Sequence, residues 1–394
     1  MTEGDYFHVY VIMELEDARL VPVSLEMLSE ARRLIDNLNK KHGSDEKVVA
    51  VLLGHNVKGL TKTLIEHGAD FVVYADHPEL KEVRNTIYTK IVSQIAKDRE
   101  IAAKVSAKYA EQFKKPRYMF FGADAIGRHL SSTALVELDS GLASDINKLE
   151  ISDINLTHQN KTGGKQELYE KTLEMYRPDF SGFLWTTILC LDNKNPAIKR
   201  DYHPQACSII PGVFEPLKQD PTRKGQVIEF IPKIDEPDLK VRILSRKAIK
   251  SDVDFESRKA IVSFGRGIRD FPEQNIKLVE DLAKQLGAEI GVSLPISKKP
   301  FSVSENLAST YMNSERVIGT SGRKVSPMLY VAVGISGAMQ HVAGMKEAEF
   351  IVAINPDENS PIKDESDIFI KGRMEEIIPK LIEELKKQSA VVEA

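Results

Sequence analysis

Cysteine is scarce in this sequence of 394 residues, with Cys190 and Cys207 as the two examples. An iron–sulfur cluster needs about four thiolate ligands, so a cluster domain is excluded. The chain also contains no CxxC or HExxH pattern, and we expect no metal site. We expect no disulfide between the two cysteines, because thiols stay reduced in a cytoplasmic setting.

Long apolar runs and a strong charge of one sign are also missing. No apolar stretch approaches the ~18–20 residues that cross a bilayer. The opening residues, MTEGDYFHVYVIME, have no basic segment ahead of an apolar one. The formal net charge of −4 gives no sign of a nucleic-acid partner. We therefore expect a cytoplasmic protein with no membrane insertion and no nucleic-acid partner.

The length and composition fit a water-soluble globular protein of two or three domains, with 42% hydrophobic and 28% charged residues. Strand-like apolar runs alternate with helical patterns in the first part of the chain, which is typical of a parallel sheet buried on both faces. Ser24 is the predicted N-cap of the first helix, and Gly43 its end. Strands are predicted at 6–13, 48–53, 71–74 and 117–121, and helices at 24–43, 60–67 and 80–114.

The character changes between 148 and 249, where strand-like runs are separated by polar, turn-rich segments. We expect an antiparallel extension of the first domain here. The charged segment 251–258 is the predicted linker between an N-terminal domain, 1–250, and a C-terminal domain, 259–394. The strands expected in the extension are 149–156, 183–191, 206–210, 227–231 and 241–244.

The C-terminal domain contains a glycine-rich block from Gly319 to Asn355. It predicts a strand at 331–335, a short helix at 338–343 opened by Ser336 and closed by Gly344, and a strand at 350–354. Free N–H groups at such a turn would bind a phosphate or pyrophosphate. The block has neither GxGxxG nor the P-loop spacing, so neither standard nucleotide fingerprint applies.

This block resembles the FAD-binding signature of the electron transfer flavoprotein alpha subunit family. The likeness is long and ungapped, and it extends more loosely to GADAIGRHL at 122–130 and to Pro211–Phe214. The matching residues of the block are Leu329-Tyr330, Gly334-Ile335-Ser336-Gly337-Ala338, Gln340-His341, Ala343-Gly344-Met345 and Val352-Ala353-Ile354-Asn355.

The resemblance implies an α/β protein. Its N-terminal domain would have a parallel sheet of the adenine nucleotide alpha hydrolase-like kind with an antiparallel extension, and its C-terminal domain would bind FAD. A beta subunit would complete a heterodimer. The pair would take electrons from a flavoprotein dehydrogenase, such as an acyl-CoA dehydrogenase, and pass them to a downstream redox acceptor, with the flavin supplying the redox chemistry.

Fifteen site residues follow from the resemblance, and His341 is the expected donor near the N1–O2 edge of the flavin. The alternative for His341 is a core histidine satisfied by a backbone carbonyl, and for Arg266 a solvated turn arginine. No nucleophile–base pair stands out, so no catalytic residue is predicted. The cofactor-binding residues are Arg266, Ser293, Ile318, Gly319, Thr320, Ser321, Ser336, Gly337, Ala338, Met339, Gln340, His341, Asn355, Arg373 and Met374.

Two positions depart from the family pattern. Leu294 stands where the family has an arginine against the flavin ring, and Lys298 or Lys299 could restore that charge. Arg373-Met374 stands where the family has Asp-Leu near the adenine. Three alternatives stay open: an electron-bifurcating, NADH-dependent flavoprotein subunit, a stand-alone FAD- or NAD-dependent oxidoreductase, and a nucleotide-binding regulatory module.

Overall fold

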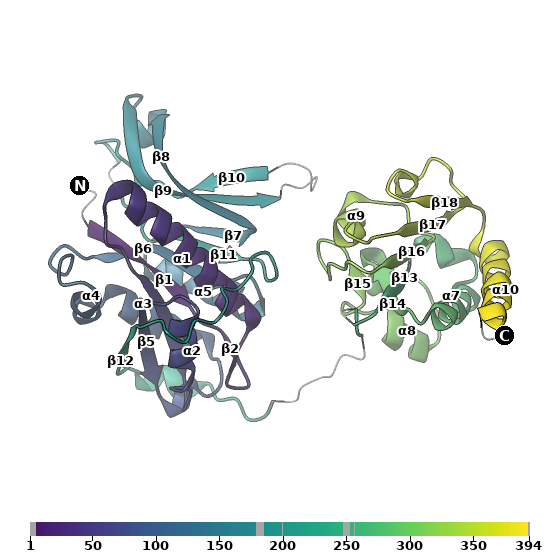
Figure 1. The fold of residues 1–394 in the computed structure, drawn as a ribbon, viewed down its shortest axis with the longest axis horizontal. Coiled ribbons are helices and arrows are strands. Elements are labelled where there is room, and N and C mark those ends of the chain that lie inside the picture. Colours follow the sequence, from purple (N-terminus) through teal and green to yellow (C-terminus); the bar gives the residue numbers. More distant parts are fainter. Residues whose placement is uncertain (1–4, 179–184, 199, 247–252, 256, 393–394) are drawn as a thin grey trace. The chain divides into compact units, whose positions relative to one another are not determined.

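A computed structural model describes residues 5–178, 185–198, 200–246, 253–255 and 257–392 (Figure 1). The chain divides into two compact units, the first ending at Arg246. Residues 251, 252 and 256 of the predicted linker lie outside the described residues, so the linker stays a prediction. Among the helices described, none is long and apolar enough to cross a membrane.

The first unit is built on a seven-stranded, wholly parallel sheet in the order β12-β5-β4-β1-β6-β11-β7. Every residue of β1 and β4 is buried, as expected for strands covered on both faces. The strands are β1 Tyr6–Ile12, β4 Val48–Gly54, β5 Phe71–Asp76, β6 Lys115–Gly122, β7 Leu142–Ile146, β11 Gln205–Ile209 and β12 Gln226–Phe230, with a small hairpin of β2 Leu15–Glu16 and β3 Arg19–Leu20.

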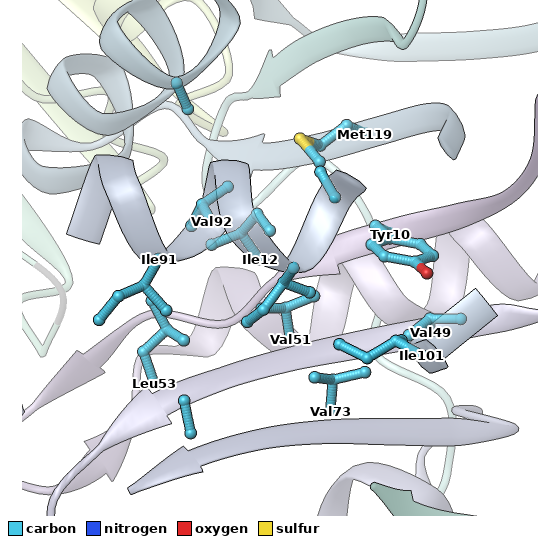
Figure 2. Packing of buried hydrophobic residues seen from close by; sticks show 14 of the residues in the cluster. Tyr10, Ile12, Val49, Val51, Leu53, Val73, Ile91, Val92, Ile101 and Met119 are labelled. Carbon is cyan, nitrogen blue, oxygen red and sulfur yellow. The ribbon is translucent and has the colours of Figure 1, made fainter. Parts of the chain in front are cut away.

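Helices cover both faces of this sheet. Figure 2 shows the core on one face, where Val51 and Val73 of the sheet pack with Ile91 and Ile101 of the helices. The helices on this face are α3 Asn85–Lys97, α4 Arg99–Val105 and α5 Ala125–Glu137. The helices on the other face are α1 Pro22–His42 and α2 Leu60–Glu66.

Two helix predictions in this unit need correction. The helix predicted at 80–114 is two helices, because Asp98 leaves helical geometry and its carboxylate accepts the Ile101 N–H as the N-cap of α4. Ser24 is not an N-cap, since α1 begins at Pro22 after Val21. The Ser24 hydroxyl instead accepts the Glu14 N–H at 2.9 Å. Gly43 does end α1, in left-handed geometry.

The antiparallel extension is confirmed in part. Three antiparallel strands form it, and their buried residues Leu149, Leu173 and Met175 join the core beneath α1. The runs at 206–210 and 227–231 were expected there, but they are β11 and β12 of the parallel sheet; a short apolar run does not encode strand direction. The run at 241–244 forms no strand. The extension consists of β8 Lys148–Thr157, β9 Gln166–Pro178 and β10 Trp185–Leu189, beside α6 Gln159–Thr162.

The second unit contains a six-stranded parallel sheet in the order β15-β14-β13-β16-β17-β18. The first strand along the chain lies in the middle, and the order reverses between β13 and β16. This 3-2-1-4-5-6 order is that of dinucleotide-binding doubly wound sheets. The strands are β13 Ala260–Phe264, β14 Glu289–Ser293, β15 Val317–Ile318, β16 Leu329–Val333, β17 Ile351–Asn355 and β18 Ile368–Lys371.

Helices flank this second sheet too, and α7 and α10 pack in one core through Val279 and Ile378. The helix predicted at 338–343 is α9; it begins at Met339 rather than directly after Ser336, and Gly344 lies inside it. Pro379 lies within α10 and does not interrupt it. The helices are α7 Pro272–Leu286, α8 Glu305–Tyr311, α9 Met339–Met345 and α10 Met374–Val392, with 3-10 turns at Arg266–Asp270, Leu294–Lys298 and Pro361–Lys363.

Candidate functional site

A cleft of about 870 Å³ lies within the second unit, at the carboxyl edge of its sheet. The segments at or after the ends of all six strands line it, including Arg266 after β13 and Ser336 after β16. Ligands of open α/β sheets bind at this edge, where the strand order reverses. The volume is in the range of cofactor-binding pockets.

Most of the predicted site residues meet at this cleft. Gly337 and Met339 do not line it. Gly337 has a φ of 81° and packs so closely that a Cβ there would lie 2.1 Å from the Ile362 nitrogen, while the Met339 side chain is 40% exposed. The thirteen lining residues are Arg266, Ser293, Ile318, Gly319, Thr320, Ser321, Ser336, Ala338, Gln340, His341, Asn355, Arg373 and Met374.

Several lining residues were not predicted. They include Gly265, Gly267, Asp270, Phe301 and Asp357, all in segments that follow strands of the sheet or reach its edge from a loop. The signal that could have identified the glycines is their position directly after an apolar strand. That position becomes informative once the strand order is known.

Glycines let the two loops at the reversal point touch. A Cβ on Gly267 would lie 2.5 Å from the Gly334 Cα, and Gly334 itself has a φ of 59°. The Gly267 N–H donates to the Gly334 carbonyl at 3.0 Å. The floor of the cleft between β13 and β16 is therefore backbone, which leaves room for a ligand above it.

Several residues that line the cleft have unused hydrogen-bond donors. Among the described residues, the backbone N–H groups of Ser336, Ala338 and Gln340 have no hydrogen-bond acceptor. Arg266 is exposed, and its guanidinium has no ion pair within the described part of the chain. Free amides and a guanidinium that line the same cleft are suited to a phosphate or pyrophosphate.

His341 lines the cleft, and both of its ring nitrogens have partners inside the unit. Nδ1 lies 3.0 Å from the Ile318 carbonyl oxygen, and Nε2 lies 2.9 Å from the Tyr330 hydroxyl. Burial lowers the pKa of His341 to about 4, so the ring is neutral near pH 7. The carbonyl contact expected for a core histidine is present, although this buried residue also lines the cleft. With both ring nitrogens bonded inside the unit, the ring in this conformation has no free N–H for the expected donation to the flavin.

The positions that depart from the family pattern also lie at this cleft. Leu294 lines it, whereas Lys298 and Lys299 are exposed and are not among its lining residues. Arg373 forms an ion pair with Asp270, which lies in the 3-10 turn after β13. This pair links the segments that follow β13 and β18.

Comparisons with known proteins agree with this architecture. A family model described as the electron transfer flavoprotein FAD-binding domain matches residues 254–346, and one described as the electron transfer flavoprotein domain matches residues 9–173. The second sheet begins within the FAD-binding-domain match. The cleft-lining segments that follow β13, β14, β15 and β16 also lie within that match.

Relatives match over nearly the whole chain. The electron transfer flavoprotein subunit alpha of Thermoanaerobacterium thermosaccharolyticum is 34% identical, over 98% of this chain and 99% of its own length. Protein FixB of Clostridium saccharobutylicum is 33% identical over 98% of both chains. The acryloyl-CoA reductase electron transfer subunit beta of Anaerotignum propionicum is 31% identical, over 96% of this chain and 95% of its own. The chain therefore belongs to the electron transfer flavoprotein alpha subunit family.

Proposed function

We propose that this chain binds FAD in the cleft of its second unit and carries electrons as the alpha subunit of a heterodimer with a beta subunit. The observation that carries the proposal is the cofactor-sized cleft at the reversal point of the second sheet, within a region that matches the FAD-binding domain of the family. The bound flavin would supply the redox chemistry, while the protein binds and orients it.

The residues present fit a dinucleotide. The free amides of Ser336, Ala338 and Gln340 and the side chain of Arg266 would hold the pyrophosphate. Apolar lining residues, among them Ile335, would supply walls for flat rings. The other predicted site residues would contribute backbone and side-chain contacts around these two groups.

Acyl-CoA chemistry is the proposed source of electrons. One relative is named as an electron transfer subunit of an acryloyl-CoA reductase, and others are named as electron transfer flavoprotein subunits. The first name supports an acyl-CoA-linked partner, although a reductase consumes electrons rather than supplying them. We propose that the donor here is a flavoprotein dehydrogenase of the acyl-CoA dehydrogenase type, with a separate protein as acceptor. The proposed compartment is the cytoplasm.

Analysis of released flavin tests the binding proposal. We expect the chain, copurified with its beta subunit, to be yellow and to release FAD on denaturation. Two FAD molecules per heterodimer, with direct reduction by NADH, would favour the electron-bifurcating alternative. A colourless heterodimer that does not take up added FAD would contradict the proposal.

A proline substitution sharpens this test, because the N–H of Ala338 can be deleted with little change of backbone. Ala338 has a φ of −57°, close to the angle that proline fixes. We expect Ala338→Pro to weaken FAD binding about tenfold, the loss of one hydrogen bond to a charged group. Ala338→Gly keeps the N–H and should bind FAD more tightly than the proline variant. Equal affinities would show that this amide does not hold the ligand.

A further inference from the structure

A buried hydrogen-bonded chain runs beneath the cleft and links three elements. Tyr330 of β16 is fully buried, and its hydroxyl oxygen lies 2.9 Å from Nε2 of His341 in α9. The opposite ring nitrogen, Nδ1, lies 3.0 Å from the carbonyl oxygen of Ile318 in β15. Tyr330 is not among the residues that line the cleft, so it would act through His341.

The partners determine where the proton of His341 is. A carbonyl oxygen accepts hydrogen bonds only, so Nδ1 carries the proton and donates it to Ile318. In a neutral ring, Nε2 is then an acceptor, and the Tyr330 hydroxyl donates to it. Burial raises the pKa of Tyr330, which keeps this hydroxyl protonated.

In the described part of the chain, no charged side chain bonds to the His341 ring and so favours its cationic form. None of the charged residues that line the cleft makes a hydrogen bond or ion pair with the His341 ring. The ring is therefore buried between two neutral partners. Burial lowers the pKa of His341 and favours its neutral form, whereas the hydrogen bond to the Ile318 carbonyl acts in the opposite direction. The charged lining residues are Arg266, Arg269, Asp270, Asp357, Arg373 and Glu375.

The hydrogen bonds of His341 also join two parts of the cleft wall that are in close contact. A Cβ on Gly344 of α9 would lie 2.3 Å from the Gly319 nitrogen, and the Thr320 N–H donates to the Gln340 carbonyl at 2.8 Å. The segment after β15 and the start of α9 therefore form one packed wall. A change in the orientation of the His341 ring would therefore alter the hydrogen bond at Ile318 in this wall.

We infer that Tyr330 is a positioning residue of the site: its hydroxyl, at Nε2, holds the His341 ring in the orientation in which Nδ1–H donates to Ile318, and so determines which edge of that ring faces a bound flavin. The inference rests on the proposed function for its consequence, but not for the contact itself. A neutral His341 adds no positive charge beside the flavin. A cationic ring would stabilise the negative charge that develops on reduction and would raise the flavin potential.

Nitrogen NMR of labelled histidine tests the contact directly. We would record long-range ¹H–¹⁵N spectra of the full chain with its beta subunit, before and after flavin removal, and assign His341 by its loss in His341→Gln. Between about pH 5 and 8, the wild type should show the neutral Nδ1–H form. A cationic ring or an Nε2–H form in the wild type would overturn the inference, whatever the fate of the variants.

Tyr330→Phe tests the role of the hydroxyl. The hydroxyl donates to Nε2 of the neutral ring and can accept from Nε2–H of the cation, so its removal leaves Nε2 without a partner in either form, and the cation loses the stronger, charge-assisted bond. We therefore expect the proton affinity of His341 to fall about tenfold. The matched control is Tyr311→Phe, which removes a hydroxyl that donates to Glu280 at 2.7 Å elsewhere in the unit. An unchanged His341 titration in Tyr330→Phe would overturn the inference.

The flavin potential separates the inference from the proposed function. In Tyr330→Phe we expect the flavin potential to shift, because the His341 ring is no longer held in one orientation beside the flavin, and we expect no such shift in Tyr311→Phe. A potential that is equal to that of the wild type at every pH would overturn the link to the flavin. If no flavin binds to the wild type, the proposed function fails, while the NMR titration still decides whether Tyr330 controls His341.

Discussion

At the scale of single residues, Glu14 is a buried carboxyl group that the proposed site does not use. It is 4% exposed, and its Oε1 accepts the Gly122 N–H at 2.8 Å at the carboxyl edge of the first sheet. Two glycines make room for it, since a Cβ on Gly122 or Gly127 would lie 2.5 or 2.3 Å from Oε1. Burial raises the pKa of Glu14 to about 9, so it is protonated in the folded protein near pH 7.

This group makes stability depend on pH in a defined direction. The folded state holds a proton that the unfolded state releases above about pH 4.3, the ordinary pKa of glutamate. The stabilisation from Glu14 is therefore complete below that pH and is lost as pH rises towards 9, by about 1.4 kcal/mol per pH unit.

Glu14→Gln tests this sign, because glutamine keeps the acceptor but cannot ionise. We expect the free energy of unfolding of the variant, relative to the wild type, to increase between about pH 5 and pH 8. Urea unfolding at the two pH values measures it. The lowered pKa of His8, in the same unit, affects both proteins equally and cancels. A difference that does not change with pH would mean that Glu14 is ionised in the folded protein.

At the scale of elements, periodicity predicted most strands and helices of both sheets. The continuous apolar runs of β1, β4 and β13 are buried strands, as expected. The glycine-rich block contains the predicted strand, helix and strand, with the helix beginning at Met339. Composition cannot give strand direction, which is why β11 was misassigned to an antiparallel extension.

The convergence of the predicted residues on one cleft could be anticipated from the sequence to a similar degree, whereas their contacts with a cofactor stay a prediction. Of the fifteen residues predicted from the resemblance, thirteen line one cleft, because they follow strand ends that converge at one edge of the sheet. The resemblance could not predict the hydrogen bond between the Tyr330 hydroxyl and Nε2 of His341, since that contact depends on how β16 and α9 pack. Nor could it predict the pairing of Arg373 with Asp270, which joins segments 103 residues apart.

The contact between α9 and the segment after β15 yields a prediction about Gly344. Alanine normally stabilises a helix interior by about 1 kcal/mol relative to glycine. Here the added methyl would lie 2.3 Å from backbone, so overpacking should outweigh that gain, and we expect Gly344→Ala to lose about 1–2 kcal/mol of unfolding free energy and to bind FAD less well. Urea unfolding and FAD titration measure both effects.

The control for this substitution is Gly59→Ala, at the N-cap of α2 in the first unit. No atom lies within 4 Å of a Cβ at Gly59, so stability should change by less than about 0.5 kcal/mol. If Gly344→Ala were as stable as the wild type, the wall formed by α9 and the Ile318–Ser321 segment would be looser than the structure indicates.

At the scale of the whole molecule, two units with parallel sheets share one chain, and the cleft lies entirely within the second. The residues proposed to contact FAD all belong to the second unit. Family membership extends over both units, since relatives match 98% of the chain. A carrier differs from an enzyme in that its redox change requires partner proteins, and this requirement is what an experiment can test.

Anaerobic titration of the chain, copurified with its beta subunit and followed by visible absorbance, tests the central claim most directly. An acyl-CoA dehydrogenase and its substrate would supply electrons. The account predicts that the FAD spectrum bleaches in proportion to the substrate added, and only when the dehydrogenase is present. Absence of bound flavin, or steady turnover of the substrate by the heterodimer alone, would contradict it.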